Sequence, residues 1–305
     1  MISFVKKFIL NDQTCNAHPH NVYSMIITHL SDGLGNQLFN YAFGRVLSLH
    51  HQVPLKTDLY WFKHEVNTAY RTYGMSHFDI QAPEASWQEL DEYIFADTKW
   101  HRLTTPYYKR VCIREKARRY DPNVWRFPRK TFLTGYWQAW RYYANYHEEL
   151  RREFRIVTPP SASAARLYDQ FRSDSSVAIH IRRGDYLTNQ SFNVLPIDYY
   201  NTAINYLQER YESLNWYVFS DDPKWAYDNL TSAKNPFIVQ GLADIDDFRL
   251  MNSTNHSIIA NSTFSWWAAW LKPLDGRTII APKTPFHDSS LWNADDFLPP
   301  HFVRL

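Results

Sequence analysis

Basic and acidic side chains directly follow an apolar run in the stretch VAIHIRRGDY. His180, Arg182, Arg183 and Asp185 stand within six consecutive residues. A guanidinium group matches a diphosphate through two parallel hydrogen bonds, so the pattern predicts that Arg182 binds such an anion at the end of a buried strand. Arg183 is expected to point to the opposite face of the strand and to form a structural ion pair.

A second group of polar residues precedes an aromatic helix. Asn261, Ser262 and Thr263 come directly before a helix that is expected to begin near Phe264. The N–H groups and the positive dipole end of a helix start attract phosphate, although Ser or Thr here also serves as an ordinary helix cap. Arg182 on a neighbouring strand end favours the first interpretation. Ser262, Thr263 and Phe264 are therefore candidate binding residues for a diphosphate ligand.

Two carboxylates, Asp221 and Asp222, follow the next expected strand, WYVFS. A carboxylate does not contact phosphate without a metal, but it accepts hydrogen bonds from the N–H edge of guanine or from ribose hydroxyls. We assign that nucleoside contact to Asp221. Asp222 precedes Pro223, a favoured residue of the first helical turn, and is expected to cap the helix that follows.

The stretch SDGLGNQLF, residues 31–39, joins an expected strand to an expected helix. It is similar to a dinucleotide-binding loop, but Leu38 stands where G-x-G-x-x-G would have its third glycine. The two glycines still allow close approach of a ligand to the backbone. We expect Asn36 to lie at the helix start and to point toward the other half of the protein.

The sequence contains no zinc-type spacing, Walker sequence or nucleophile elbow. Asp244 and Asp246 form a single D-x-D pair, a spacing that also arises by chance. We therefore expect no metal ion and no bound cofactor.

The elements that carry these residues alternate between strand and helix patterns. Such alternation is typical of βαβ units on a parallel sheet, whose ligands bind beyond the carboxyl ends of the strands. The polar residues named above follow strands, so we expect them to meet in one cleft. The strand patterns cover 177–182, 216–220, 237–241, 256–260 and 278–282, with helical patterns between them.

The first half of the chain is less regular. A strand is expected over 25–30 and a helix over 35–51, and VTPPSASAA, residues 157–165, has the composition of a linker. A chain of 305 residues exceeds the roughly 250–300 residues that one core spans, so two domains are expected. We predict an N-terminal extension at 1–24, an acceptor-side N-terminal domain at 25–157 and a Rossmann-like C-terminal domain at 158–305.

Composition excludes several classes of protein. The 33 Lys and Arg residues against 31 Asp and Glu residues leave a net charge of +2, too small for a nucleic-acid-binding protein that depends on counterion release. Cys15 and Cys112 cannot form a disulfide framework, and no run of about 20 apolar residues could span a bilayer. These features predict a cytoplasmic protein with free thiols. The aromatic content of 17% suits either an aromatic core or a sugar-binding protein.

Five motifs together resemble those of a known family. GLGNQLFNYA, GYWQ, HIRRGDY, FSDDPKW and NSTFSWWAAWL occur in this order and resemble the motif set of bacterial-type α-1,2-fucosyltransferases of glycosyltransferase family 11. The resemblance runs from about Met25 to the C-terminus, and the segment before it departs from the family pattern. It implies an α/β, GT-B-like fold of two Rossmann-like domains facing across a cleft. It also implies GDP-fucose as the donor, no metal, and inverting transfer to the 2-hydroxyl of a terminal β-galactoside.

The resemblance further implies roles for single residues. Arg182 and His180 would contact GDP, Asp221 would address the guanosine, and Asn36 would approach the donor from the N-terminal domain. The residues that would line the phosphate and fucose are Ser262, Thr263 and Phe264.

Inverting transfer in one step calls for a group that takes the proton of the acceptor hydroxyl. Asp185 is the first candidate, although a carboxylate there also suits hydrogen bonds that fix the loop after Gly184. Asp32, beside the glycine loop, is the second candidate, and an early fucosyl cation would need no base. Residues 136–138 of the GYWQ motif suit either the acceptor or the core.

The acceptor is expected to be a galactoside-terminated oligosaccharide or a lipid-linked glycan. Between Arg102 and Arg141 there are eleven Lys and Arg residues and two acidic ones, which indicates a solvated face or docking at an anionic membrane. Two other functions stay open. One is a protein O-fucosyltransferase, which the absence of a secretory signal and of a disulfide framework disfavours, and the other is a sugar-binding protein without catalysis.

Overall fold

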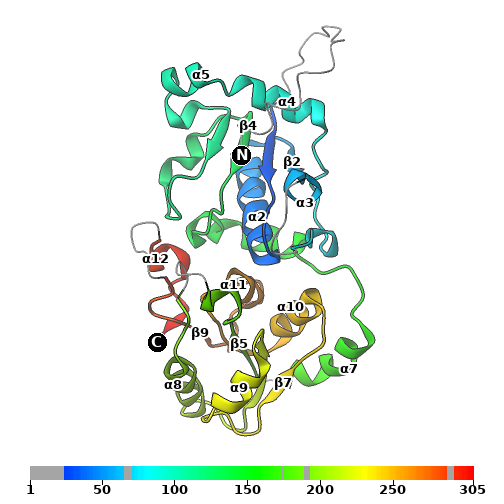
Figure 1. Ribbon diagram of the computed structural model, residues 1–305, viewed down its shortest axis with the longest axis vertical. Coiled ribbons are helices and arrows are strands. Elements are labelled where there is room, and N and C mark those ends of the chain that lie inside the picture. Colours follow the sequence, from blue (N-terminus) through cyan, green and yellow to red (C-terminus); the bar gives the residue numbers. More distant parts are fainter. Residues whose placement is uncertain (1–23, 65–70, 173–174, 189–192, 287–291) are drawn as a thin grey trace.

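The computed structural model describes residues 24–64, 71–172, 175–188, 193–286 and 292–305. These residues form two α/β domains, one above the other in Figure 1, each with a parallel sheet and helices beside it. The expected α/β architecture is thereby confirmed. Cys112 is a free thiol, whereas Cys15 and the predicted extension, apart from Ser24, lie outside the described residues.

The N-terminal domain is built on a four-stranded parallel sheet of order β2-β1-β4-β3. Its strands are β1 (Ile26–His29), β2 (Leu55–Asp58), β3 (Cys112–Arg114) and β4 (Thr131–Thr134). Its helices are α2 (Leu34–His51), α3 (Tyr60–His64), α4 (Trp87–Ala96), α5 (Lys99–Thr104) and α6 (His147–Glu153). The expected helix over 35–51 is confirmed as α2. Strand β3 does not follow from the sequence pattern, because it is three residues long and lies in a basic run without clear apolar alternation.

The C-terminal domain has a six-stranded parallel sheet of order β10-β9-β8-β5-β6-β7. Its strands are β5 (Ser176–Ile181), β6 (Asn215–Ser220), β7 (Phe237–Val239), β8 (His256–Ile258), β9 (Ile279–Ala281) and β10 (Val303–Arg304). Its helices are α7 (Ala162–Phe171), α8 (Ile197–Gln208), α9 (Pro223–Asn229), α10 (Asp244–Ser253), α11 (Thr263–Trp270) and α12 (Ala294–Phe297). The five predicted strands are confirmed, although β7, β8 and β9 are shorter than their patterns. Because the strands are parallel, the loops after β5, β6 and β8 lie at one edge of the sheet.

The segment 157–165, expected to be a linker, is shorter than its composition suggests. Helix α7 begins at Ala162, with Ser161 as its cap, so the expectation was wrong for residues 162–165. Their small side chains are compatible with helix as well as with a linker. The backbone N–H of Ser161 donates to Asp246 Oδ2 of α10 (3.2 Å), which gives one carboxylate of the D-x-D pair a structural role.

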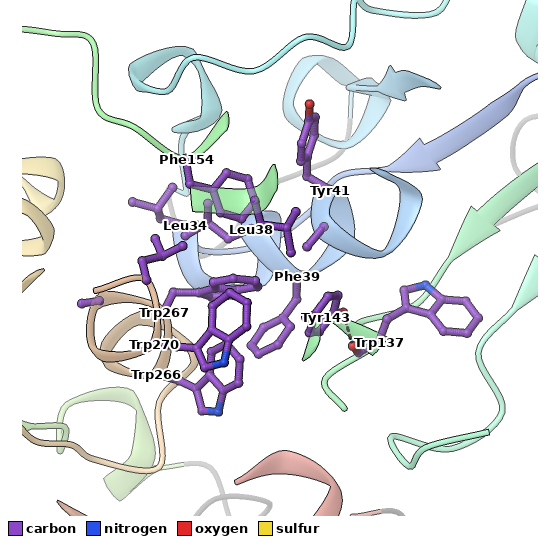
Figure 2. Packing of buried hydrophobic residues seen from close by; sticks show 14 of the residues in the cluster. Leu34, Leu38, Phe39, Tyr41, Trp137, Tyr143, Phe154, Trp266, Trp267 and Trp270 are labelled. Atoms are coloured by element: carbon purple, nitrogen blue, oxygen red, sulfur yellow. Dashed lines mark hydrogen bonds between the residues drawn. The ribbon is translucent and has the colours of Figure 1, made fainter. Parts of the chain in front are cut away.

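Helices α2 and α11 join the two domains through an aromatic core (Figure 2). The ring centroid of Phe39 on α2 lies 4.8 Å from those of both Trp266 and Trp267 on α11. Tyr143, which precedes α6, adds a ring contact 5.6 Å from Trp267. All four side chains are buried completely. Many aromatic residues of this chain therefore serve the core, and the two domains share one hydrophobic cluster.

The basic run 102–141 is not simply a solvated face. The guanidinium of Arg118 lies over the rings of Tyr136 and Trp292, 4.4 and 4.1 Å from their centroids. Arg141 donates to a carboxylate of the C-terminal domain at 2.9 Å. Some of these cations therefore hold the structure together, and contact with a membrane stays a prediction. In the part of the chain that the structure describes, no helix combines the length and apolar character needed to cross a bilayer.

Gly35 lies where α2 meets α11, and we expect Gly35→Ala to destabilise the protein. A Cβ atom there would lie 2.4 Å from Phe264 N and 2.5 Å from the carbonyl carbon of Thr263. Overpacking of this kind costs about 1–3 kcal/mol of unfolding free energy, which urea denaturation would measure. Gly33→Ala is the matched control, because its Cβ would lie 3.8 Å from the Arg71 side chain, an ordinary contact. Equal stability of the two variants would contradict a tight contact at Gly35.

Candidate active site

Asp221, at the end of β6, fixes the loop that follows β5. Its Oδ1 accepts a hydrogen bond from Arg183 N (2.8 Å) and its Oδ2 accepts one from Gly184 N (3.1 Å). A Cβ atom on Gly184 would lie 2.9 Å from Asp221 Oδ2, so a larger residue there would have to displace that carboxylate. The sequence offers Asp185 as the residue that fixes this loop, whereas in the structure Asp221 accepts the two backbone hydrogen bonds. Contact between Asp221 and a nucleoside stays a prediction.

Two carboxylates hold the guanidinium of Arg182. Its Nε and Nη2 lie 2.9 and 2.7 Å from Asp185 Oδ1, and its Nη1 lies 3.1 Å from Asp221 Oδ2. The Arg182 side chain is 23% exposed, so part of the group remains open to a ligand. The structure thus brings the predicted residues Arg182, Asp185 and Asp221 together in one cluster.

Arg71 extends this cluster into the N-terminal domain. Its Nη2 lies 3.5 Å from Asp185 Oδ2, and its side chain also approaches Gly33 of the glycine loop. Sequence reasoning missed Arg71, because a single arginine outside any motif carries no signal that it will meet a distant loop. The site is therefore built from both domains.

The interpretations of Arg183 and Asp222 are confirmed. Arg183 Nε lies 3.3 Å from Asp222 Oδ2, and its guanidinium lies 3.8 Å from the centroid of the Trp225 ring. Asp222 Oδ1 accepts a hydrogen bond from Trp225 N at 3.2 Å and so caps α9. Both residues serve the structure beside the site.

The helix start at α11 is capped and lies against the glycine loop. Ser262 Oγ accepts a hydrogen bond from Phe264 N at 3.3 Å, which confirms the capping interpretation for Ser262. Gly35, in the first turn of α2, lies against the backbone of Thr263 and Phe264. Helix α2 itself begins after Gly33, which provides no side-chain cap. Two positive helix ends thus meet at the domain junction, and phosphate binding by residues 262–264 stays a prediction.

His180 is a buried, neutral residue beneath the start of α11. Its ring centroid lies 6.0 Å from that of Phe264, and its Nδ1 is buried without a hydrogen-bond partner among the described residues. Burial, with a smaller effect of the Arg182 charge, lowers the pKa of His180 to about 3. The imidazole therefore carries no charge near neutral pH, and its contact with GDP stays a prediction.

Asn36 lies at the start of α2, as expected, and one of its polar groups pairs within its own domain. Its Oδ1 accepts a hydrogen bond from Gln138 Nε2 at 3.0 Å, so the amide oxygen is held within the N-terminal domain. Gly35, the residue before it, makes the contact with the C-terminal domain. A direct contact between Asn36 and a donor stays a prediction.

Asp32 and Tyr136 form a second polar cluster on the N-terminal side. Tyr136 Oη donates to Asp32 Oδ2 at 2.5 Å, and Asp32 has the left-handed backbone angle φ of +63° that side chains seldom adopt. Tyr136 N donates to Glu115 Oε2 at 2.7 Å, and burial raises the pKa of Glu115 to about 7. Trp137 instead stacks on Phe43 in the core. Of the two aromatics in GYWQ, Tyr136 faces the polar cluster.

No three His, Cys, Asp or Glu side chains within the described ranges gather closely enough to hold a metal ion. Near the junction, the geometry instead provides guanidinium groups, two helix starts and the carboxylates of Asp32, Asp185 and Asp221. These groups suit the binding of an anion and the acceptance of a proton.

Comparison with known proteins identifies the family. The model described as glycosyl transferase family 11 matches residues 113–300. An alpha-1,2-colitosyltransferase from Escherichia coli is 31% identical over 294 residues, which cover 92% of this chain and 99% of that protein. A galactoside alpha-(1,2)-fucosyltransferase 1 from Oryctolagus cuniculus is 24% identical over 298 residues, covering 92% of this chain and 72% of that protein.

Solved structures support the fold. The fucosyltransferase NodZ from Bradyrhizobium has a TM-score of 0.53 at 14% identity, over 82% of this chain and 94% of that one. A NodZ alpha-1,6-fucosyltransferase soaked with GDP-fucose has a TM-score of 0.51 at 13% identity, over 82% and 93%. This likeness confirms the GT-B-like architecture. From the family model and the relative that matches almost its whole length, the chain belongs to glycosyltransferase family 11.

Proposed function

We propose that the protein transfers L-fucose from GDP-fucose to the 2-hydroxyl of a terminal β-galactoside in a glycan, with inversion at C1. One observation carries the proposal: in a chain of this family, two carboxylates hold the guanidinium of Arg182 at the end of β5. A relative bears the name galactoside alpha-(1,2)-fucosyltransferase, and a protein of similar fold was soaked with GDP-fucose. These names support fucose as the transferred sugar and a galactoside as the acceptor.

The groups at the junction fit the charge changes of this reaction. The 2-hydroxyl oxygen of galactose bonds to C1 of fucose while the bond from C1 to the diphosphate oxygen breaks. The electron pair leaves with GDP, so negative charge grows on the diphosphate. Arg182 and the N–H groups at the start of α11 would stabilise that charge, as a metal ion does in metal-dependent transferases. Asp185 and Asp221 keep the guanidinium oriented before the donor binds.

The proton of the acceptor hydroxyl goes to a base, and we assign this role to Asp32. Asp185 is the first candidate from the sequence, but its Oδ1 pairs with Arg182 and its Oδ2 faces Arg71. Asp32 lies in the glycine loop of the N-terminal domain, where the Tyr136 hydroxyl orients its carboxylate. A base there would take the proton of the acceptor hydroxyl as the new bond to C1 forms.

Transfer of colitose is the second candidate function, because a relative that is 31% identical over 92% of this chain is an alpha-1,2-colitosyltransferase. Colitose is fucose without its 3-hydroxyl group. Both donors therefore present the same kind of leaving diphosphate and the same C1 to the site. The contacts made at the 3-position of the sugar decide between them.

Turnover of GDP-fucose and of GDP-colitose against a panel of β-galactosides, with linkage analysis of the product, tests the function. We expect an α-1,2-fucosylated galactoside, and we expect kcat to be unchanged in EDTA because Arg182 and the helix start take the place of a metal. Faster transfer from GDP-colitose would establish the second candidate. Transfer to folded protein domains, or GDP binding without transfer, would contradict the proposal, and a loss in EDTA that Mn²⁺ restores would contradict the metal-free mechanism.

Arg182→Ala should lower kcat by about 10²–10³, the usual effect of removing a preorganised donor in the transition state. Arg182→Lys should recover little, because an ammonium group cannot reproduce the planar two-pronged contact. Arg183→Lys is the matched control, since Arg183 pairs with Asp222 beside the site and should keep kcat near normal. Circular dichroism and thermal melting confirm folding. A folded Arg182→Ala enzyme with normal kcat would remove this residue from the mechanism.

Asp32→Asn should lower kcat for transfer to galactosides by about 10²–10⁴ and leave the KM for GDP-fucose unchanged, because a general base acts only on the acceptor proton. Asp185→Asn should instead raise the KM for GDP-fucose, since it loosens the hold on Arg182. The measurement is kcat and both KM values for the two variants. A large loss of kcat in Asp185→Asn, with normal kcat in Asp32→Asn, would return the role of base to Asp185.

A further inference from the structure

A cavity of about 430 Å³ lies in the N-terminal domain, at the carboxyl end of β2 and beside α3 and the start of α4. Its volume falls in the range of roughly 300–1,000 Å³ that is usual for small-molecule sites. The described residues that line it include none of those to which a donor contact has been assigned. The cavity is therefore a separate feature of the acceptor-side domain.

Three aromatic rings stand at this cavity. The ring centroid of Tyr60 lies 5.4 Å from that of Trp87 and 4.8 Å from that of His64, and His64 lies 5.6 Å from Trp87. Trp87 is 53% exposed, so the described residues cover its indole ring only in part. Helix α4 begins at Trp87 with a capping box between Ser86 and Glu89, which presents the ring from a fixed helix start. Flat apolar faces of this kind suit the C–H faces of sugar rings.

Charged side chains of both signs line the same cavity. Lys63 Nζ lies 2.6 Å from Glu84 Oε1, and Lys56 pairs with Glu89. With Asp58 the lining has three carboxylates and two ammonium groups, so it offers no net positive charge to a phosphate or an anionic headgroup. Carboxylates and ammonium groups accept and donate hydrogen bonds at the edges of a neutral polyhydroxylated ligand. Aromatic faces with such polar edges describe a saccharide site.

Asp58 connects the cavity to the glycine loop. It ends β2 beside His29, the last residue of β1, whose Nδ1 lies 2.6 Å from Asp58 Oδ2. The carbonyl oxygen of Asp58 accepts a hydrogen bond from Leu30 N at 3.0 Å. Leu30 leads directly into the loop that contains Asp32. The cavity therefore lies at the end of β2, next to the end of β1, and the loop that contains the proposed base Asp32 follows β1.

We propose that this cavity binds a sugar residue of the acceptor glycan other than the galactose that receives the transferred sugar. The inference rests on the proposed function and names the part of the chain that recognises the acceptor beyond its terminal residue. It predicts that the enzyme prefers an oligosaccharide to a simple galactoside, and that Trp87 is responsible for part of this preference.

The test compares the wild type with Trp87→Ala on methyl β-D-galactopyranoside, lactose, N-acetyllactosamine and galacto-N-biose, with GDP-fucose as donor. We expect the wild type to have a lower KM for at least one disaccharide than for the methyl galactoside. Trp87→Ala should raise the KM for that disaccharide roughly two- to tenfold, the size of one lost aromatic contact, and leave the KM values for the methyl galactoside and GDP-fucose unchanged. Trp100→Ala, which removes a 74% exposed tryptophan from α5, is the matched control.

Saturation-transfer-difference NMR without a donor gives a readout that does not depend on turnover. We expect signals from the second sugar ring of the disaccharide in the wild type and Trp100→Ala, and their loss in folded Trp87→Ala. Equal KM values and equal NMR signals for the two variants would overturn the cavity as a subsite. Failure of the proposed function looks different, because the wild type would then transfer fucose to none of the four acceptors, the methyl galactoside included.

Discussion

Packing of α2 against α11 is the contact on which the geometry of the site depends. The two helices begin at the domain junction, where Gly35 lies against the backbone of Thr263 and Phe264. Gln37, in the first turn of α2, is fully buried and connects this helix to two loops. Its Nε2 donates to the carbonyl oxygens of Asp32 (2.8 Å) and Thr72 (2.9 Å). The loops of Asp32 and of the neighbouring Arg71 are therefore placed by the same helix that packs on the C-terminal domain.

The charges at the junction balance one another before any ligand is present. Arg71 and Arg182 face Asp185 and Asp221, two positive and two negative groups that link the domains. In the proposed function, a diphosphate would add negative charge to this cluster and would be bound by both guanidinium groups and the helix starts together. The negative charges of Asp185 and Asp221 would weaken the attraction for that anion, but they hold Arg182 in a single orientation.

The sequence predicts the parts of this protein that depend on local pattern. The structure confirms the strand over 177–182, the helix over 35–51, the cap at Asp222 and the ion pair of Arg183, which follow from apolar runs and neighbouring residue types. Strand β10 is only two residues long and carries too few residues to form a pattern. Elements with a clear local pattern can therefore be predicted from the chain alone, whereas a strand as short as β10 cannot.

Contacts between distant segments are harder to predict from one sequence. The approach of Arg71 to Asp185 and the hold of Asp221 on Gly184 depend on how loops far apart in the chain meet after folding. Asn36 belongs to a recognisable motif, but its pairing with Gln138 depends on which way its side chain points from the first turn of α2. Residue types do not specify that direction. Residue chemistry indicated which side chains gather at the junction, whereas their partners required the three-dimensional structure.

The aromatic core that α2 and α11 share limits how the protein can be divided or recombined. A cut in the linker would leave Trp266 and Trp267 on one fragment and Phe39 and Tyr143 on the other, with large apolar surfaces facing water. The N-terminal half is thus not a unit that could be exchanged by itself. A chimera that takes its N-terminal half from another transferase would therefore need a matching α11 as well.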